Sequence, residues 1–526
     1  MLGPVLRLAS VWLSPAILLS VPPLLLADGT HGLWPALALL AGACLAVTVL
    51  GGPWGALRED VSLPGLASRR WLATPPLLVP LTGAAAGTAL LFLWAQLMAA
   101  GEVAHALGWP VPGGIGAMAL ALALLGGMDR PARHIAAAGA ALAVLGLGMP
   151  IGAVLLVTDP VWPRVWDAVA SRGRPVFRAD GAWVREAQPV HGAGRAGADI
   201  RIPLGEEQRV VLQGRGTVRL EGRHGATWRR EVDGPVEILV QPGDWLVVPD
   251  GFPLRFQSGR TIPGAPPSGA EWVEPARRPG AGRALTGLGV TLLAGALGLA
   301  PVHGGLPATG RGSPRPAALA AVLAGGGLGV AGLWALYTAW LTPEIYLAGV
   351  RGSEVYALPG RVDGLGPTGA VLGSLASVGL LGGGLAAGLS ALRGVPARAP
   401  VLRPALAVTA GLLAALVPAS PWTLLVLAFG VGAAAGAPAA VFASWGERVT
   451  PFGLAAGALV GLAVFAGLTV AGFAGLADRP EGAWLGWLAA WPAVAAAPLN
   501  ALVAWLVSAA GPPGGRPAQE LAGPET

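Results

Sequence analysis

Residues Leu77 to Ala100 read LLVPLTGAAAGTALLFLWAQLMAA, a run without a charged side chain. A helix of about 20 apolar residues is long enough to cross the hydrocarbon core of a bilayer. Similar runs recur along the chain: 54% of the 526 residues are hydrophobic and 12% are charged, against about a quarter charged in soluble proteins. The sequence therefore predicts an all-α integral membrane protein, because lipid offers no partners to backbone N–H and C=O groups.

Twelve such segments are expected to be membrane helices. They are Leu8–Ala27, Gly32–Gly51, Leu77–Ala100, Gly113–Met128, Ile135–Val157, Ala284–Val302, Ala317–Leu341, Gly369–Leu392, Arg403–Val417, Trp422–Ala443, Phe452–Leu476 and Trp484–Ser508. The first could instead be a cleaved signal peptide, but its three prolines suit an irregular membrane helix better. The predicted parts are helices 1–5 (residues 1–158), a polar insert (159–283), helices 6–10 (284–443), helices 11–12 (444–510) and a disordered Pro/Gly-rich tail (511–526).

Arginine placement predicts the orientation. Outside the insert, 13 arginines fall on one side of the membrane when the connections are numbered alternately. The short loops of the other side hold only Arg351, Arg361 and Arg479. Cytoplasmic loops of membrane proteins are enriched in basic residues. We therefore expect a multi-pass protein of the cell's inner (plasma) membrane, with both termini in the cytoplasm and the insert on the external side.

The insert is expected to be a small all-β domain. It carries 18 arginines and 15 acids in residues 159–283, and four short segments rich in β-branched residues are separated by turn residues. These segments are Arg209–Leu212, Thr217–Glu221, Val236–Val240 and Trp245–Val248. The turns around Pro242-Gly243 and Pro249-Asp250-Gly251 resemble the second motif of cupin barrels. Leu254 stands where metal-binding cupins have a histidine, and His224 stands alone, so a barrel or sandwich without metal ligands is the preferred interpretation.

Other classes of protein are excluded by composition. The basic residues are all arginine and lie between apolar runs rather than in a stripe, so we expect no nucleic-acid partner. Cys44 is the one cysteine, which rules out an intrachain disulfide, a Cys-ligated zinc site and an iron–sulfur cluster. No catalytic or nucleotide-binding motif occurs, so the chain is predicted not to be an enzyme and to hold no cofactor or metal.

Polar residues within the apolar runs are the candidates for function, since each is costly in lipid. Gln96 lies deep in the third segment and Glu102 directly follows it. One hypothesis has Gln96 contacting a solute and Glu102 binding a proton or cation. The plainer interpretation, preferred for Glu102, is that Gln96 bonds a neighbouring helix and Glu102 reaches external water.

Two segments are expected to be interrupted. The sixth contains Pro301 and His303 within Gly298–Gly305, and the first contains Ser10 and Ser14-Pro15. Broken helices at corresponding positions of two halves are the best sequence-level indication of a transporter site. The alternative is a pair of proline-kinked helices without a solute.

These residues resemble the sodium/solute symporter family, closest to its cation/acetate branch. Leu93 to Gly101, with Trp94 and Gln96, is similar to the family's third core helix, and Leu125-Gly126-Gly127-Met128 to the end of the fourth. Ser444 to Gly453 resembles its loop of aromatic, basic residue and Thr before a Gly-rich helix, and Gly298 to His303 its Gly-Leu-Pro-His. The matches run in order from about Leu8 to Leu476.

The resemblance implies a LeuT-like core of two inverted five-helix repeats, with the solute between helices 1 and 6, flanked by 3 and 8. It implies symport of a small organic solute, with a monocarboxylate as the candidate, coupled to Na⁺ or H⁺. The substrate-binding candidates are Ser10, Ser14, Trp94, Gln96, Pro301 and His303. The ion-coupling candidates are Glu102, Ser374 and Ser377.

Two departures from the family matter. The helix that usually precedes the core is missing, and Gly379 and Leu380 stand where the family has the hydroxyl pair of its second sodium site. The missing hydroxyl pair and the added β insert favour an alternative function: a transport-inactive relative that works as a membrane sensor or assembly partner, with the β insert binding an external ligand or protein.

Overall fold

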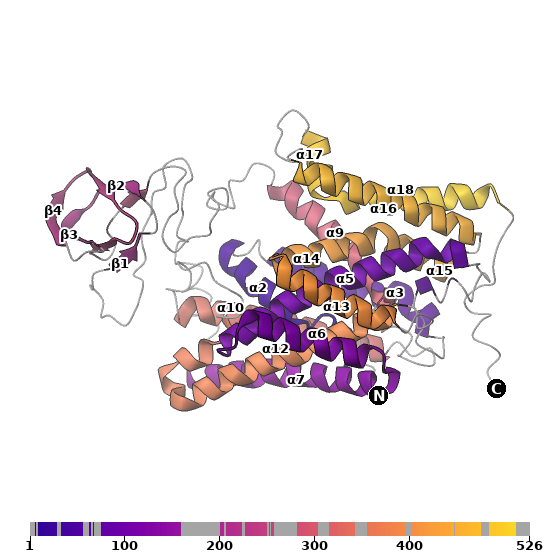
Figure 1. The fold of residues 1–526 in the computed structure, drawn as a ribbon, viewed down its shortest axis with the longest axis horizontal. Helices are drawn as coiled ribbons and strands as arrows, with labels where there is room; N and C mark the ends of the chain where they lie inside the picture. The colour runs from indigo at the N-terminus through magenta and orange to yellow at the C-terminus, as the bar shows by residue number, and fades with distance from the viewer. Residues whose placement is uncertain are drawn as a thin grey trace.

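The computed structural model is mostly helical, with a small β-rich part at one end (Figure 1). It describes residues 6, 9–28, 33–55, 63–64, 67, 75–158, 200–204, 207–222, 227–249, 252, 254–256, 281–302, 315–341, 355–395, 401–446, 448–474 and 483–511. The predicted tail after Gly511 therefore lies outside the described residues, as does His303.

Each of the twelve apolar segments contains helix where it is described, and the first of them is interrupted at residues 11–14. The helices of the first half are α2 (Pro15–Asp28), α3 (Leu33–Gly55), α5 (Pro75–Ala106), α6 (Val111–Gly126) and α7 (Asp129–Val157). Those of the second half are α9 (Ala281–Val302), α10 (Arg315–Leu341), α12 (Gly366–Arg393), α13 (Leu402–Leu416), α14 (Pro421–Val431), α15 (Ala437–Trp445), α16 (Pro451–Phe473), α17 (Ala483–Ala490) and α18 (Pro492–Ala509). Several begin with proline, whose fixed φ and missing N–H suit the first turn of a helix.

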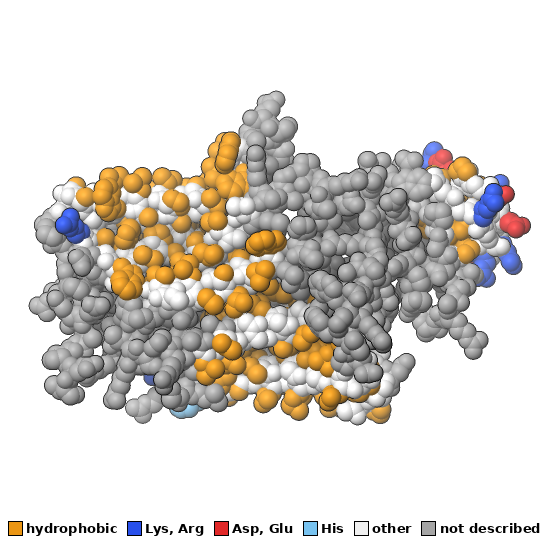
Figure 2. Space-filling view, turned by 180° about the vertical axis from the view of Figure 1, so that it is seen from behind, with side chains coloured by type: hydrophobic (Ala, Val, Ile, Leu, Met, Phe, Trp, Pro, Cys, Tyr) orange, Lys and Arg blue, Asp and Glu red, His pale blue; other side chains and the backbone are white. Residues whose placement is uncertain are grey.

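Six stretches in the described part are long and apolar enough to cross a membrane: Leu78–Ala106, Pro131–Val157, Gly366–Arg393, Pro421–Trp445, Pro451–Phe473 and Pro492–Ala509. Four more described stretches are apolar but shorter: Trp34–Leu50, Val111–Gly126, Thr286–Leu299 and Leu402–Leu416. Large apolar side chains such as Leu156 and Phe473 are exposed, and Figure 2 shows hydrophobic side chains spread over the described helical surface. These features indicate a multi-pass membrane protein. The number of twelve crossings remains a prediction from the sequence.

Small residues let the longest helices approach closely. On α7, Gly146 packs against α12 so tightly that a Cβ atom there would lie 2.7 Å from the Gly379 Cα atom. A Cβ atom on Gly383 would lie 2.7 Å from the Leu13 carbonyl oxygen. The glycine triplet Gly382-Gly383-Gly384 therefore serves close packing, as small residues do in membrane helices.

The tenth and twelfth segments are less regular than predicted. A π-helical turn, η8 (Gly432–Gly436), joins α14 to α15, and the twelfth segment is divided at Trp491 into α17 and α18. The π turn lies just before Pro438, which has no N–H to donate to the carbonyl four residues earlier.

The predicted break in the sixth segment is wrong as far as the described residues reach. Helix α9 continues without interruption through Gly298 and Pro301 to Val302. Pro301 falls in the last turn, where it removes a single hydrogen bond. Gly298 has a different role: its Cα faces η8 so closely that a Cβ atom would collide with the Gly432 carbonyl. Glycine here permits helix contact and does not end the helix.

In the described part of the insert, seven strands form two antiparallel sheets. One sheet has the order β1 (Ile200–Pro203), β6 (Trp245–Val248), β3 (Arg215–Glu221), β4 (Thr227–Asp233). The other has the order β5 (Val236–Val240), β2 (Gln208–Leu212), β7 (Leu254–Phe256). Both sheets contribute to one hydrophobic core that includes Val218, Val240, Leu246 and Leu254. Leu254, at the position of the cupin histidine, is therefore a core residue.

Candidate functional site

The first apolar segment is interrupted in the interior of the protein. Ala9 and Ser10 are helical, Val11 to Leu13 form a turn, Ser14 is irregular, and α2 begins at Pro15. A residue that precedes proline is disfavoured in helical conformation, so the Ser14-Pro15 pair sets the position of the break, as predicted. Every side chain from Ala9 to Val21 is buried, which places the break away from the surface.

Gln96 of α5 holds the start of α2 with both ends of its amide. Its Oε1 atom accepts a hydrogen bond from the Ala16 backbone N–H at 3.3 Å, and its Nε2 atom donates to the Ser14 hydroxyl at 3.2 Å. Gln96, Ser14 and Ala16 are all completely buried. The first N–H groups of a helix have no partner within the helix. The third apolar segment therefore stabilises the interruption of the first.

A pair of serines joins the same region to α12. The Ser10 and Ser390 hydroxyl oxygens lie 3.0 Å apart, and the Ser390 hydroxyl also donates to the Ala386 carbonyl at 2.8 Å. Ser390 is 5% exposed. Sequence reasoning missed Ser390, although a hydroxyl within the eighth apolar segment was a signal of the same kind as Ser10. Ser10, Ser14, Gln96 and Ser390 are called the central polar cluster below.

The other predicted solute contacts are placed as follows. Trp94 lies two residues from Gln96 on α5 and packs, partly buried, against two of the buried apolar clusters. Its indole Nε1 atom is buried and has no hydrogen-bond partner among the described residues. Pro301 lies in the last turn of α9, while His303 is beyond the described residues.

The ion-coupling candidates do not form a hydroxyl pair. Ser374 is exposed and donates to the Ala370 carbonyl at 3.0 Å, and Ser377 is largely buried and donates to the Gly373 carbonyl at 3.2 Å. Each hydroxyl thus bonds its own helix α12. Glu102 is half-buried in the last turns of α5. Among the described residues, no group of three or more His, Cys, Asp and Glu side chains could hold a metal ion.

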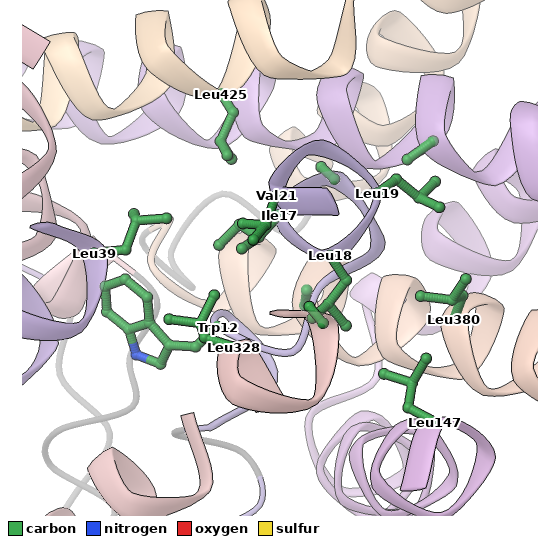
Figure 3. Packing of buried hydrophobic residues seen from close by; sticks show 14 of the residues in the cluster. Trp12, Ile17, Leu18, Leu19, Val21, Leu39, Leu147, Leu328, Leu380 and Leu425 are labelled. Atoms are coloured by element: carbon green, nitrogen blue, oxygen red, sulfur yellow. The ribbon is translucent and has the colours of Figure 1, made fainter. Parts of the chain in front are cut away.

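The helices that carry the central polar cluster are packed together by apolar side chains. Helix α2 lies against α3, α5, α10, α12 and α14. Helix α9 packs mainly against α3, η8 and α14, and also contacts α5, α15, α17 and α18. Ile17, Phe92, Leu292, Leu380 and Phe429 belong to one cluster of buried residues that spans α2, α5, α9, α12 and α14. Figure 3 shows Ile17, Leu18, Leu380, Leu425 and their neighbours filling the space around α2.

Prolines within the helices create a second set of polar contacts. Leu18, Val49 and Ala434 each precede a proline by four residues (Pro22, Pro53 and Pro438), so their carbonyls lack the usual N–H donor. The Tyr356 hydroxyl donates to the Leu18 oxygen at 2.7 Å, Trp445 Nε1 to the Val49 oxygen at 2.8 Å, and Asn500 Nδ2 to the Ala434 oxygen at 2.7 Å. In each case a side chain from a distant part of the chain supplies the missing donor.

Tyr356 comes from the short segment before η6 (Leu358–Arg361), η7 (Asp363–Leu365) and α12. Its ring lies 5.1 Å from that of Trp334 of α10, whose Nε1 atom donates to the Leu147 carbonyl of α7 at 3.3 Å. Burial raises the pKa of Tyr356 far above its ordinary value, so its hydroxyl remains a hydrogen-bond donor. This segment thereby ties α2 to α10 and α7.

The models of known protein families find no match in the chain, and a search of the curated proteins finds no matching sequence.

Proposed function

We propose that this membrane protein moves a small organic solute across the inner membrane by alternating access, as a secondary active transporter. The observation that carries the proposal is the buried interruption before Pro15, where Gln96 bonds Ser14 and the Ala16 N–H and where Ser10 bonds Ser390. Irregular backbone within a membrane protein is tolerated where it lies inside protein or lines a pathway. Discontinuous helices supply the solute sites of many transporters.

The central polar cluster supplies the groups that would meet the solute. Ser10, Ser14, Gln96 and Ser390 come from three helices, so a relative movement of these helices exchanges their mutual hydrogen bonds for bonds to a solute. Trp94 supplies a buried N–H without a partner in the described part of the chain, and polar groups of this kind need a partner when buried. Pro301, in the last turn of α9, and His303, which lies outside the described residues, complete the proposed set.

The family and the orientation belong to the same proposal. Membership of the sodium/solute symporters with a LeuT-like core rests on the motifs around Trp94, Gly126 and Thr450, and the interrupted first helix agrees with it. The uninterrupted α9 does not support it. Both termini are proposed to lie in the cytoplasm and the β-rich part outside, from the distribution of arginines.

A second candidate is a transport-inactive relative that acts as a sensor or assembly partner through its external β-rich part. Two observations favour it. The helices around the cluster are packed with Leu, Ala and aromatic side chains, and Ser374 and Ser377 bond only to their own helix in the contacts given above.

Uptake by the purified full-length protein in proteoliposomes separates the two. A panel of labelled solutes, both charged (acetate, pyruvate) and uncharged (lactamide, glycerol), is tested with Na⁺ gradients, proton gradients and neither. We expect protein-dependent uptake of at least one solute, and a decrease of about tenfold or more in Gln96→Leu, which leaves the Ala16 N–H without its acceptor.

Thr469→Val is the matched control, because it removes a half-buried hydroxyl that bonds within α16, at 2.7 Å from the Phe465 carbonyl. Its uptake is expected to equal that of the unaltered protein. If folded protein moves no solute under any gradient, the transporter proposal is wrong. Specific binding of a ligand to the β-rich part would then favour the second candidate.

A further inference from the structure

Strand β4 forms one edge of the four-stranded sheet in the β-rich part. It pairs with β3 along its whole length, and in the described part of the chain no strand lies on its other side. Among the edge strands β1, β4, β5 and β7 it is the longest, with seven residues, and five of its side chains are exposed. An edge strand presents backbone N–H and C=O groups with which another strand can pair. The free side of β4 can therefore accept a further strand.

The two faces of β4 differ in character. Successive side chains along a strand point to opposite faces of the sheet. Val232 lies in the core of the β-rich part and Trp228 packs against that core, so these two residues mark the inner face. The residues of the outer face are all polar or charged: Thr227, Arg229, Glu231 and Asp233. A strand that extends the sheet has to match apolar groups on one face and charges on the other.

The order of charges along β4 decides which strand fits. Charged side chains commonly protect an edge strand against pairing. Within its own sheet Arg229 lies opposite Arg219, and Glu231 lies opposite Thr217. Opposite charges at facing positions stabilise a strand pair, and like charges destabilise it. A strand on the free side that places an acid opposite Arg229 and a base opposite Glu231 is therefore favoured.

A second copy of β4 has this pattern. When two β4 strands pair antiparallel about Arg230, Arg229 of each copy lies opposite Glu231 of the other. Trp228 of each copy then lies opposite Val232 of the other on the inner face, and all seven residues of both strands are paired. The arrangement has twofold symmetry, the commonest symmetry of protein oligomers. Arg230 meets its own copy at the axis, where its side chain is exposed and salt screens the repulsion.

Other registers of the same strand pair are disfavoured. A shift of two residues in one direction places Arg229 opposite its own copy, and a shift in the other direction places Glu231 opposite its own copy. Like charges then face each other. A shift of one residue brings the inner face of one copy to the same side as the outer face of the other. The charge order along β4 thus selects the register centred on Arg230.

We propose that two copies of this chain associate through β4, which joins their four-stranded sheets into one continuous sheet. The partner is a second copy of the chain, recognised by backbone hydrogen bonds between the strands and by the two Arg229–Glu231 ion pairs. This association does not depend on what the helical part does, so a failure of the transport proposal leaves it standing.

Disulfide cross-linking of the full-length protein in membranes tests the register. In a Cys44→Ser background, Arg230→Cys places the new thiol opposite its own copy, where facing Cα atoms lie about 4.5–5.5 Å apart, within the range of a disulfide. Thr227→Cys is the matched control: it is also exposed, keeps both ion pairs, and lies about six residues, or about 20 Å, along the strand from its own copy. After mild oxidation we expect at least about tenfold more covalent dimer from Arg230→Cys. Equal cross-linking at the two positions, or none at either, overturns the proposal.

Charge reversal tests the ion pairs. Arg229→Glu places two acids opposite each other twice in the dimer, so the dissociation constant of the full-length protein in detergent, measured by sedimentation, should rise about tenfold or more. The double variant Arg229→Glu, Glu231→Arg restores opposite charges and should return the constant to within about threefold of the unaltered value. Glu207→Arg, an exposed reversal just before β2, should leave it unchanged. No weakening in Arg229→Glu, or no recovery in the double variant, contradicts the proposal.

Discussion

Leu18 and Ala434 show how a proline leaves one helix carbonyl without its N–H donor, and how a side chain from a distant part of the chain donates instead. Pro22 and Pro438 remove the N–H groups that these carbonyls would accept, and water is not at hand inside a membrane helix bundle to replace them. Tyr356 and Asn500, at 0% and 1% exposure, supply the donors. The two prolines therefore explain why polar side chains are buried at positions 356 and 500.

Tyr356→Phe should lower the free energy of unfolding by about 1–3 kcal/mol, because the buried Leu18 carbonyl loses its donor. The measurement is thermal unfolding of the detergent-purified protein. In a Pro22→Ala background, residue 22 regains an N–H that can donate to Leu18, so Tyr356→Phe should cost less there. Thr291→Val, which removes a buried hydroxyl that bonds Gly287 within α9 at 2.8 Å, is the control. If Tyr356→Phe lowers the free energy of unfolding equally in both backgrounds, Pro22 is not the reason that the Leu18 carbonyl needs the Tyr356 hydroxyl.

Asn500→Leu should destabilise the protein by a similar amount, about 1–3 kcal/mol, since the Ala434 carbonyl at the π turn loses its closest donor. Pro438→Ala restores the N–H within the helix and should relieve most of that loss in the double variant. The same unfolding measurement checks both. A double variant as unstable as Asn500→Leu alone would contradict the argument.

At the scale of elements, close helix contact depends on particular glycines. Gly146 of α7 faces α12, whereas Gly148, two residues further along the same helix, has nothing within 4 Å of a Cβ position. The two positions have the same intrinsic helix propensity and differ only in their surroundings.

Gly146→Val should therefore reduce the stability of the helix pair by about 1–3 kcal/mol or more, because the side chain has to push α7 and α12 apart. Gly148→Val should have little effect. Thermal unfolding and the yield of membrane-inserted protein measure both variants. Similar losses in the two would indicate that glycine acts here through its backbone and not through contact.

At the scale of the whole molecule, the β-rich part and the helical part differ in how many charged side chains they expose. Figure 2 shows most charged side chains gathered on the β-rich part, while the described helical surface is apolar. The orientation in the membrane is predicted from the few arginines at the helix ends. Chemical labelling from one side of the membrane tests that orientation.

In a Cys44→Ser background, Glu231→Cys on exposed β4 should react with a membrane-impermeant maleimide in intact cells. His134→Cys, exposed near the start of α7, should react only after the cells are permeabilised. Labelling of the two positions is read by mass shift on a gel. The reverse pattern would invert the orientation, and equal labelling of both in intact cells would contradict the predicted crossings between them.

The candidate site was predictable in part. Ser14-Pro15 marks the break in the sequence, and Gln96 stands out as a polar residue in an apolar run. That both ends of the Gln96 amide hold α2, and that Ser390 meets Ser10, depends on which helices become neighbours. Strands β1, β4 and β7 were missed for a local reason: β1 and β7 are very short, and β4 (TWRREVD) carries four charged residues, which suit an exposed edge strand.

The sequence by itself determined that the chain is a helical membrane protein with a polar β insert, because hydropathy and turn residues act locally and need no knowledge of neighbours. Tertiary structure alone decided that Gly298 serves contact with η8 and leaves α9 unbroken, and that Tyr356 and Asn500 satisfy carbonyls more than 60 residues away. The physical reason is that a hydrogen bond or a close backbone approach requires two partners, and the identity of the second is set only by folding.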